Sequence, residues 1–312
     1  MERRVHMRLT AFVFPGQGSQ AVGMGRDLGQ ASPRWLDANA ALGFDLRRLC
    51  FDGPEADLTL TANTQPAILT ASIVALDALL AAGGRFDFVA GHSLGEYSAL
   101  VAAGALDFVD AVRTVRARGQ CMQEAVAPGE GAMAAIIGLD RSLVLQACDE
   151  AGEAGVVQVA NLNAPGQTVI AGAAAAVKRA VELARAKGAK RVLPLAVSAP
   201  FHSVLMEPAA ARLQEVLRTV RIGDLRAPLV TNVDADLLTD GGQVADALVR
   251  QVTEPVRWEE VVARLVKEGV GTFVEVGPGR VLSGLIRRIA PEARVLNVED
   301  RASLDETIAA LG

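Results

Sequence analysis

The sequence predicts an α/β fold with a mostly parallel sheet and one smaller inserted unit. Short apolar runs alternate with helical patterns over the first 127 residues and again after residue 198, which is typical of parallel strands joined by helices. Between them the order becomes strand, helix, strand, strand, helix, strand, which is ferredoxin-like. We therefore expect a discontinuous core, residues 1–127 and 199–312, and an inserted subdomain, residues 128–198.

Apolar periodicity and turn residues place the individual elements. In the first core segment we expect strands at residues 9–14 and 86–90 and helices at residues 33–42, 66–82, 96–103 and 107–126. Thr64 is the expected N-cap of the helix at residues 66–82. In the inserted unit we expect strands at residues 133–139, 156–161, 168–171 and 191–197 and helices at residues 142–151 and 173–187. In the second core segment we expect helices at residues 204–219, 242–251, 258–267 and 281–289 and strands at residues 229–232 and 272–276.

Composition excludes several classes of function. The net charge is −5 and no basic run carries interleaved aromatic residues, so we expect no nucleic-acid binding. We find no apolar stretch long and uninterrupted enough to span a bilayer, and we expect no membrane partner. The cysteines Cys50, Cys121 and Cys148 lack metal-ligand spacing and predict a reduced, cytoplasmic protein without a metal site. Residues 1–6 are charged and are interpreted as a frayed extension or upstream start.

The most informative motif is Gly-His-Ser-Leu-Gly at residues 91–95, between an expected strand and an expected helix. Strand, Gly-x-Ser-x-Gly and helix is the context of a nucleophile elbow. The two glycines allow strand and helix to approach closely, and the turn exposes the Ser93 hydroxyl at a helix N-terminus. Ser93 is therefore the candidate nucleophile, against the alternative of an idle serine in a small-residue turn.

A serine nucleophile needs a base, and the chain contains three histidines. His6 lies in the expected frayed start, and the side chain of His92 should leave the elbow in another direction. His202 follows an expected strand and precedes an expected helix, so we prefer it as the base. The third member stays open: an acidic residue, an amide or a backbone carbonyl could orient the imidazole.

The glycine-rich turn at residues 16–21 admits two interpretations. It matches the dinucleotide fingerprint Gly-x-Gly-x-x-Gly/Ala after a strand. That fold needs a second strand ending in an acidic residue about 20 positions further on, whereas residues 35–42 look helical. We therefore favour a turn that offers amide N–H groups to an oxyanion.

The helix at residues 107–126 carries a candidate carboxylate partner. Arg113 points away from the apolar face, whereas Arg116 and Arg118 flank its edges. Either of these two could reach a cleft and clamp a substrate carboxylate in a bidentate pair. Periodicity does not choose between them.

Taken in order, these motifs resemble the malonyl-CoA:acyl carrier protein transacylase family. The resemblance runs nearly from end to end. It rests on the segments at residues 12–20, 64–67, 91–95, 118–123, 161–167, 201–202 and 275–279. It implies a hydrolase-like α/β core with a ferredoxin-like βαββαβ insert, which agrees with the elements expected above.

The resemblance also implies the roles of the site residues. Ser93 would be the nucleophile, His202 the base, and Gln251 the residue whose carbonyl oxygen orients the imidazole. The backbone amides of Gln17 and Leu94 would form the oxyanion hole. Arg118 would bind the malonyl carboxylate, which resolves the choice that periodicity leaves open.

The activity so implied moves a malonyl group from malonyl-CoA to Ser93 and then to the phosphopantetheine thiol of acyl carrier protein, for fatty acid or polyketide synthesis. No metal or redox cofactor is required, and we expect a monomer. The alternatives are a serine thioesterase or esterase with water as acceptor, and a carrier-protein-binding scaffold with an inactive elbow. An acidic carrier protein predicts a locally basic docking surface.

Overall fold

The computed structural model describes residues 9–197 and 199–312. Its strands are β1 Leu9–Phe14, β2 Phe88–Gly91, β3 Gly131–Ile137, β4 Val157–Ala164, β5 Gln167–Ala173, β6 Arg191–Pro194, β7 Leu229–Val230, β8 Leu237–Leu238, β9 Val270–Val276 and β10 Arg294–Val298. Its α-helices are α1 Arg26–Gly29, α2 Pro33–Leu42, α3 Leu46–Asp52, α4 Glu55–Thr59, α5 Thr61–Ala81, α6 Gly95–Ala102, α7 Phe108–Glu124, α8 Arg141–Ala151, α9 Ala174–Ala186, α10 Glu207–Leu217, α11 Gly241–Arg250, α12 Trp258–Lys267, α13 Val281–Ile289 and α14 Arg301–Leu311. Short 3₁₀ turns precede β4 and α10, at Gly152–Ala154 and Val204–Met206.

The larger sheet has the strand order β10-β9-β1-β2-β7-β8 and is parallel except at β8. Both of its faces are covered. Along β1, Phe12 and Phe14 pack with helices α5, α6 and α7, whereas Ala11 and Val13 pack on the other face with α12 and α13. The α/β core predicted from the sequence is confirmed.

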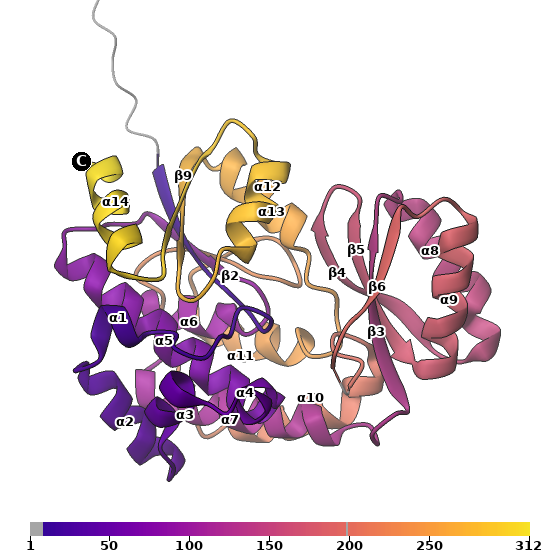
Figure 1. Ribbon diagram of the computed structural model, residues 1–312, viewed down its shortest axis with the longest axis horizontal. Coiled ribbons are helices and arrows are strands. Elements are labelled where there is room, and N and C mark those ends of the chain that lie inside the picture. Colours follow the sequence, from indigo (N-terminus) through magenta and orange to yellow (C-terminus); the bar gives the residue numbers. More distant parts are fainter. Residues whose placement is uncertain (1–8, 198) are drawn as a thin grey trace, which may run out of the picture.

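The smaller sheet is antiparallel, with the order β4-β5-β3-β6, and α8 and α9 pack against it. It forms a separate unit on the right of Figure 1. Along the chain its elements follow the order β3, α8, β4, β5, α9, β6, which is the ferredoxin-like order that the sequence predicts. The exact subdomain boundaries, residues 128 and 198, stay a prediction.

Helix α5 crosses the middle of the core. By length and composition alone it could cross a membrane, although polar residues interrupt its apolar sequence. In this structure 78% of its most apolar 18-residue window is buried against the rest of the protein. The helix is apolar all round because other elements surround it.

The predicted start of α5 was wrong, and several elements were not predicted from the sequence. Thr64 is not the N-cap: the helix begins at Thr61, and the Thr64 hydroxyl donates to the Leu58 carbonyl. Pro66 lies inside the helix just beyond its first turn, where its missing N–H leaves one carbonyl of that turn without its helical hydrogen bond. The missed elements are α1, α3, α4, β8, β10 and α14, and most of them are short.

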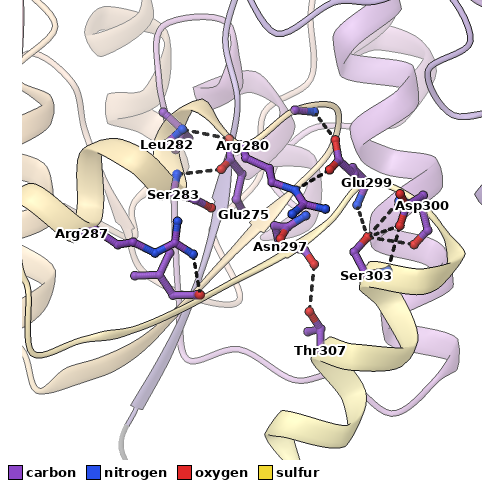
Figure 2. Close-up of polar contacts among 12 residues, drawn as sticks. Glu275, Arg280, Leu282, Ser283, Arg287, Asn297, Glu299, Asp300, Ser303 and Thr307 are labelled. Carbon is purple, nitrogen blue, oxygen red and sulfur yellow. Dashed lines mark hydrogen bonds and ion pairs between the residues drawn. The ribbon is translucent and has the colours of Figure 1, made fainter.

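The C-terminal elements are held by a local polar network (Figure 2). Glu275, near the end of β9, accepts hydrogen bonds from the backbone N–H groups of Leu282 and Ser283 in α13. Asp300 and Ser303 form a capping box at the start of α14. Glu275 thereby anchors α13 to β9, and the Thr307 hydroxyl, which donates to the Asn297 carbonyl, anchors α14 to β10.

Candidate active site

The turn that carries Ser93 joins β2 directly to α6. A Cβ atom on Gly91 would lie 1.9 Å from the backbone carbon of Gly95, and one on Gly95 would lie 2.0 Å from the carbonyl oxygen of Phe14. Both positions therefore need glycine. Ser93 has φ 51°, in the left-handed region that residues with a side chain rarely adopt. The structure places Ser93 on the sharp strand-to-helix turn that the motif predicted.

The glycine-rich turn after β1 packs against this elbow. A Cβ atom on Gly16 would lie 2.4 Å from the carbonyl oxygen of His92, because the neighbouring parallel strands β1 and β2 end at the same sheet edge. Gln17 and Leu94 both line the pocket around Ser93. Within residues 9–197 and 199–312 neither of their backbone N–H groups has a hydrogen-bond partner. Such free N–H groups are the donors that an oxyanion hole requires.

His202 reaches Ser93 from the segment between β6 and α10. Its Nε2 lies 2.8 Å from Ser93 Oγ, and its Nδ1 lies 2.7 Å from the backbone carbonyl oxygen of Gln251. A carbonyl oxygen can only accept, so Nδ1 carries the proton and Nε2 can accept one from the serine hydroxyl. His92 instead pairs its Nε2 with Asn163 Oδ1 at 2.8 Å. His6 lies outside the described residues, and so do the other residues of the segment 1–6 that was interpreted as a frayed extension or upstream start.

Gln251 contacts Ser93, His202 and Arg118. Its backbone carbonyl accepts from His202, and its side-chain oxygen accepts from Arg118 Nη2 at 2.9 Å. Its side-chain nitrogen donates to Glu96 Oε2 at 2.8 Å and to the Ser93 carbonyl oxygen at 3.1 Å. The backbone of Gln251 therefore orients the imidazole, while its side chain links the elbow to the arginine.

Arg118 enters the site from α7 and is 1% exposed. Its Nη1 donates to Gln65 Oε1 at 2.8 Å, and its Nη2 lies 3.0 Å from Ser93 Oγ. Arg116 points elsewhere and donates to Asn63. Of the two arginines that periodicity left open, the structure brings Arg118 to the serine.

These groups meet in a pocket of about 110 Å³ between the two sheets. The core contributes Ser93, His202 and Arg118, and the smaller unit contributes Met133 from β3 and Asn161 from β4. Burial changes the basicity of the buried groups. Burial, together with the nearby Arg118 cation, lowers the pKa of His202 to about 3, so the imidazole is neutral at neutral pH.

Two side chains behind the elbow, Asn232 and Glu96, have no role that the motifs predicted. Asn232 accepts from the Ser93 backbone N–H at 2.6 Å and donates to the Gly91 carbonyl at 2.7 Å, which clamps the turn from both ends. Glu96 accepts from Gln251 and from the Asn232 backbone N–H. The available signal for Glu96 was a carboxylate in a helical segment that is otherwise apolar.

Comparison with known proteins identifies the family. The acyl transferase domain family matches residues 11–304. The malonyl CoA-acyl carrier protein transacylase of Bacillus subtilis is 50% identical over 310 residues, which is 98% of each chain. This chain belongs to the malonyl CoA-acyl carrier protein transacylase family.

Solved structures of this family agree with the fold. The acyl-carrier-protein S-malonyltransferase of Burkholderia pseudomallei 1710b has a TM-score of 0.94 and 49% identity, with 96% of this chain and 99% of that chain covered. A malonyl-transacylase solved in complex with its type II PKS acyl-carrier protein also has a TM-score of 0.94, with 47% identity and 97% and 99% coverage. The family resemblance read from the sequence is confirmed.

Proposed function

We propose that this protein is an [acyl-carrier-protein] S-malonyltransferase that carries a malonyl group from malonyl-CoA to acyl carrier protein through an ester on Ser93, for fatty acid or polyketide synthesis. One observation of the site supports the malonyl specificity most strongly. The buried guanidinium of Arg118 lies 3.0 Å from Ser93 Oγ, inside the pocket that an acyl group on Ser93 would occupy. A planar guanidinium can pair with a carboxylate through two parallel hydrogen bonds.

In the first half-reaction His202 Nε2 takes the proton of the Ser93 hydroxyl as Oγ attacks the thioester carbonyl. The backbone N–H groups of Gln17 and Leu94 stabilise the resulting oxyanion. The intermediate collapses, the carbon–sulfur bond breaks, and His202 returns the proton to the departing coenzyme A thiolate. A malonyl ester remains on Ser93.

The second half-reaction is the reverse with a different thiol. The phosphopantetheine thiol of acyl carrier protein gives its proton to His202 and attacks the ester carbonyl. The carbon–oxygen bond then breaks, and the proton returns to Ser93 Oγ. The same imidazole therefore serves as base and as acid in both halves.

The base strength of His202 depends on its surroundings in this scheme. Its pKa is low because of burial and the nearby Arg118 cation. A malonyl carboxylate paired with Arg118 neutralises that cation and so raises the pKa of the imidazole. Binding of the intended substrate thereby strengthens the base.

We further propose that the enzyme acts in the cytoplasm, as a monomer, and without a metal or redox cofactor. Cys50, Cys121 and Cys148 are free and buried, which fits a reducing compartment. All of the groups in the scheme come from one chain, so a second copy is not needed to complete the site.

The main rival is a serine thioesterase with the same elbow and water as acceptor. Incubation with malonyl-CoA followed by intact-mass measurement distinguishes the two. We expect one malonyl adduct that persists in water and disappears on addition of the carrier-protein thiol. Loss of the adduct in water before the carrier-protein thiol is added, with continued consumption of malonyl-CoA, indicates a thioesterase. The absence of both an adduct and malonyl-CoA consumption indicates an inactive scaffold.

A further inference from the structure

Glu96 is a buried carboxylate that the proposed reaction does not use. It is 1% exposed and lies on α6 directly after Gly95. Its Oε2 accepts from the Gln251 side chain at 2.8 Å and from the Asn232 backbone N–H at 3.1 Å. In the described part of the chain it forms no ion pair. An ionised carboxylate in such a place is costly unless a cation lies near.

Arg118 presents the opposite case. It is a buried cation whose bonded acceptors are all neutral: Gln65 Oε1, Gln251 Oε1 and Ser93 Oγ. Its Nε finds no partner among the described residues. Its guanidinium carbon lies 5.5 Å from the centre of the Tyr97 ring, which supplies only a partial compensation.

The two buried charges are separated by one amide group. The nitrogen of the Gln251 side chain donates to Glu96, and the oxygen of the same amide accepts from Arg118. Both partners favour the same orientation of the amide, because the carboxylate accepts and the guanidinium only donates.

We propose that Glu96 is the counter-ion of Arg118 in the empty enzyme, acting through the Gln251 amide, and that the substrate carboxylate takes over this role when it binds. The inference rests on the proposed malonyl specificity. A carboxylate in direct contact with Arg118 would occupy the N–H groups that the substrate needs. From one amide away, Glu96 compensates the charge and leaves for the substrate the Arg118 N–H groups that are not bonded to Gln65, Gln251 or Ser93, Nε among them. Glu96 is thus a positioning residue that sets how tightly Arg118 holds the substrate.

The charge on Glu96 determines the conditions of the test. Its pKa is raised to about 7, mainly by burial and in small part by Asp234, against the opposing effects of Gln251, Asn232 and the Arg118 cation. The Tyr97 phenol interacts electrostatically with Glu96, and burial raises the pKa of Tyr97. Measurements at pH 8.5 therefore observe an ionised Glu96 beside a neutral Tyr97.

The first experiment is a double-mutant cycle on the unloaded enzyme, with Glu96→Gln and Arg118→Met. Each change keeps approximately the volume and removes one charge. We expect Glu96→Gln to lower Tm more when Arg118 is present than when Met occupies position 118, and the two changes in Tm should differ by at least about 2 °C. An equal effect in both backgrounds, or the opposite order, overturns the proposal. If Glu96→Gln alone does not fold, the proposal requires the double variant to fold, and its failure also contradicts the proposal.

The second experiment compares enzymes loaded on Ser93 with malonyl or acetyl groups. The malonyl carboxylate replaces the missing counter-ion, so the Tm difference between malonyl and acetyl forms should be larger in Glu96→Gln than in wild type. The malonyl-CoA concentration for half-maximal acylation should fall by about tenfold, the size of one partly screened charge interaction, and the acetyl-CoA value should not change. Unchanged or weaker malonyl preference overturns the proposal.

Glu275→Gln is the matched control. It makes the same chemical change at another buried carboxylate, whose partners are the N–H groups of α13 and not Arg118 (Figure 2). It should lower Tm and leave the malonyl–acetyl difference as in wild type. A wild-type enzyme that accepts acetyl but no malonyl refutes the proposed function, whereas the cycle still reports on Glu96 and Arg118.

Discussion

Replacement of Arg118 by alanine tests the substrate assignment most directly. In the structure the guanidinium is 1% exposed and lies 3.0 Å from Ser93 Oγ. A malonyl carboxylate that enters this pocket loses its hydration, and only a charged hydrogen-bonding partner offsets that loss. Removal of one partner of such a desolvated pair typically costs about 2–5 kcal/mol. At 1.36 kcal/mol per tenfold, kcat/KM for malonyl-CoA should fall by roughly 30-fold to several thousand-fold.

Acetyl-CoA is the internal control for Arg118→Ala. It has no carboxylate, so the wild-type guanidinium is an unneeded cation beside it. Loss of that cation also raises the pKa of His202, since Arg118 is one of the groups that lower it. Acylation by acetyl-CoA should therefore be unharmed or faster.

The assay is single-turnover acylation by each thioester, followed by intact mass. Arg116→Ala is the matched variant, because Arg116 lies on the same helix but contacts Asn63 and the Phe44 ring. It should change neither rate appreciably. A parallel loss of both substrates in Arg118→Ala would show that the residue is structural, and the malonyl specificity would lose its support from the site.

The remaining predictions concern the catalytic groups and the buried carboxylate. Ser93→Ala should form no malonyl adduct by mass spectrometry, and an adduct on Cys121 would refute the nucleophile. His202→Ala should slow acylation and discharge by about 10²–10⁴-fold, and near-normal rates in it with loss in His92→Ala would show that the wrong histidine was chosen. Gln251→Ala should slow acylation less than His202→Ala does, because the oxygen that orients His202 belongs to the backbone. Its rate should fall mainly with malonyl-CoA, because the Gln251 side chain holds Arg118, and an equal fall with acetyl-CoA would contradict this. The folded-state pKa of Glu96 is raised from 4.5 to about 7, so this group binds more protons in the folded state than in the unfolded state. The free energy of unfolding should therefore fall by about 3 kcal/mol as pH rises from 4.5 to 8. Chemical denaturation should show a weaker dependence of this free energy on pH in Glu96→Gln, and an identical dependence would refute the shift.

Local periodicity was sufficient where a helix has one apolar face. Helices α2, α12 and α13 begin and end at the residues expected from the sequence. Helix α5 lacks such a face because it is buried on all sides, and the Thr64-Pro66 pair then gave a false start. Strand β10 was missed because it is an edge strand with mixed polarity and little burial.

The candidate site was likewise predicted only where local sequence patterns were sufficient. The motif around Ser93 and the small number of histidines pointed to the pair that the structure places 2.8 Å apart. Asn232 and Glu96 could not be found in this way. They lie 136 positions apart in the chain and meet only because β7 runs beside β2, so their roles depend on the assembled sheet.

The contacts behind Ser93 also explain how the elbow keeps its strained backbone. A serine with φ 51° costs of order 1–3 kcal/mol relative to a relaxed turn. Three hydrogen bonds oppose that cost: Asn232 binds the Ser93 N–H and the Gly91 carbonyl, and Gln251 binds the Ser93 carbonyl. Each contributes about 1 kcal/mol in a buried site, so the sum is of the size needed. Because Gln251 also holds Arg118, the group that fixes the nucleophile and the group that fixes the carboxylate partner are the same side chain, and displacement of either one is transmitted to the other.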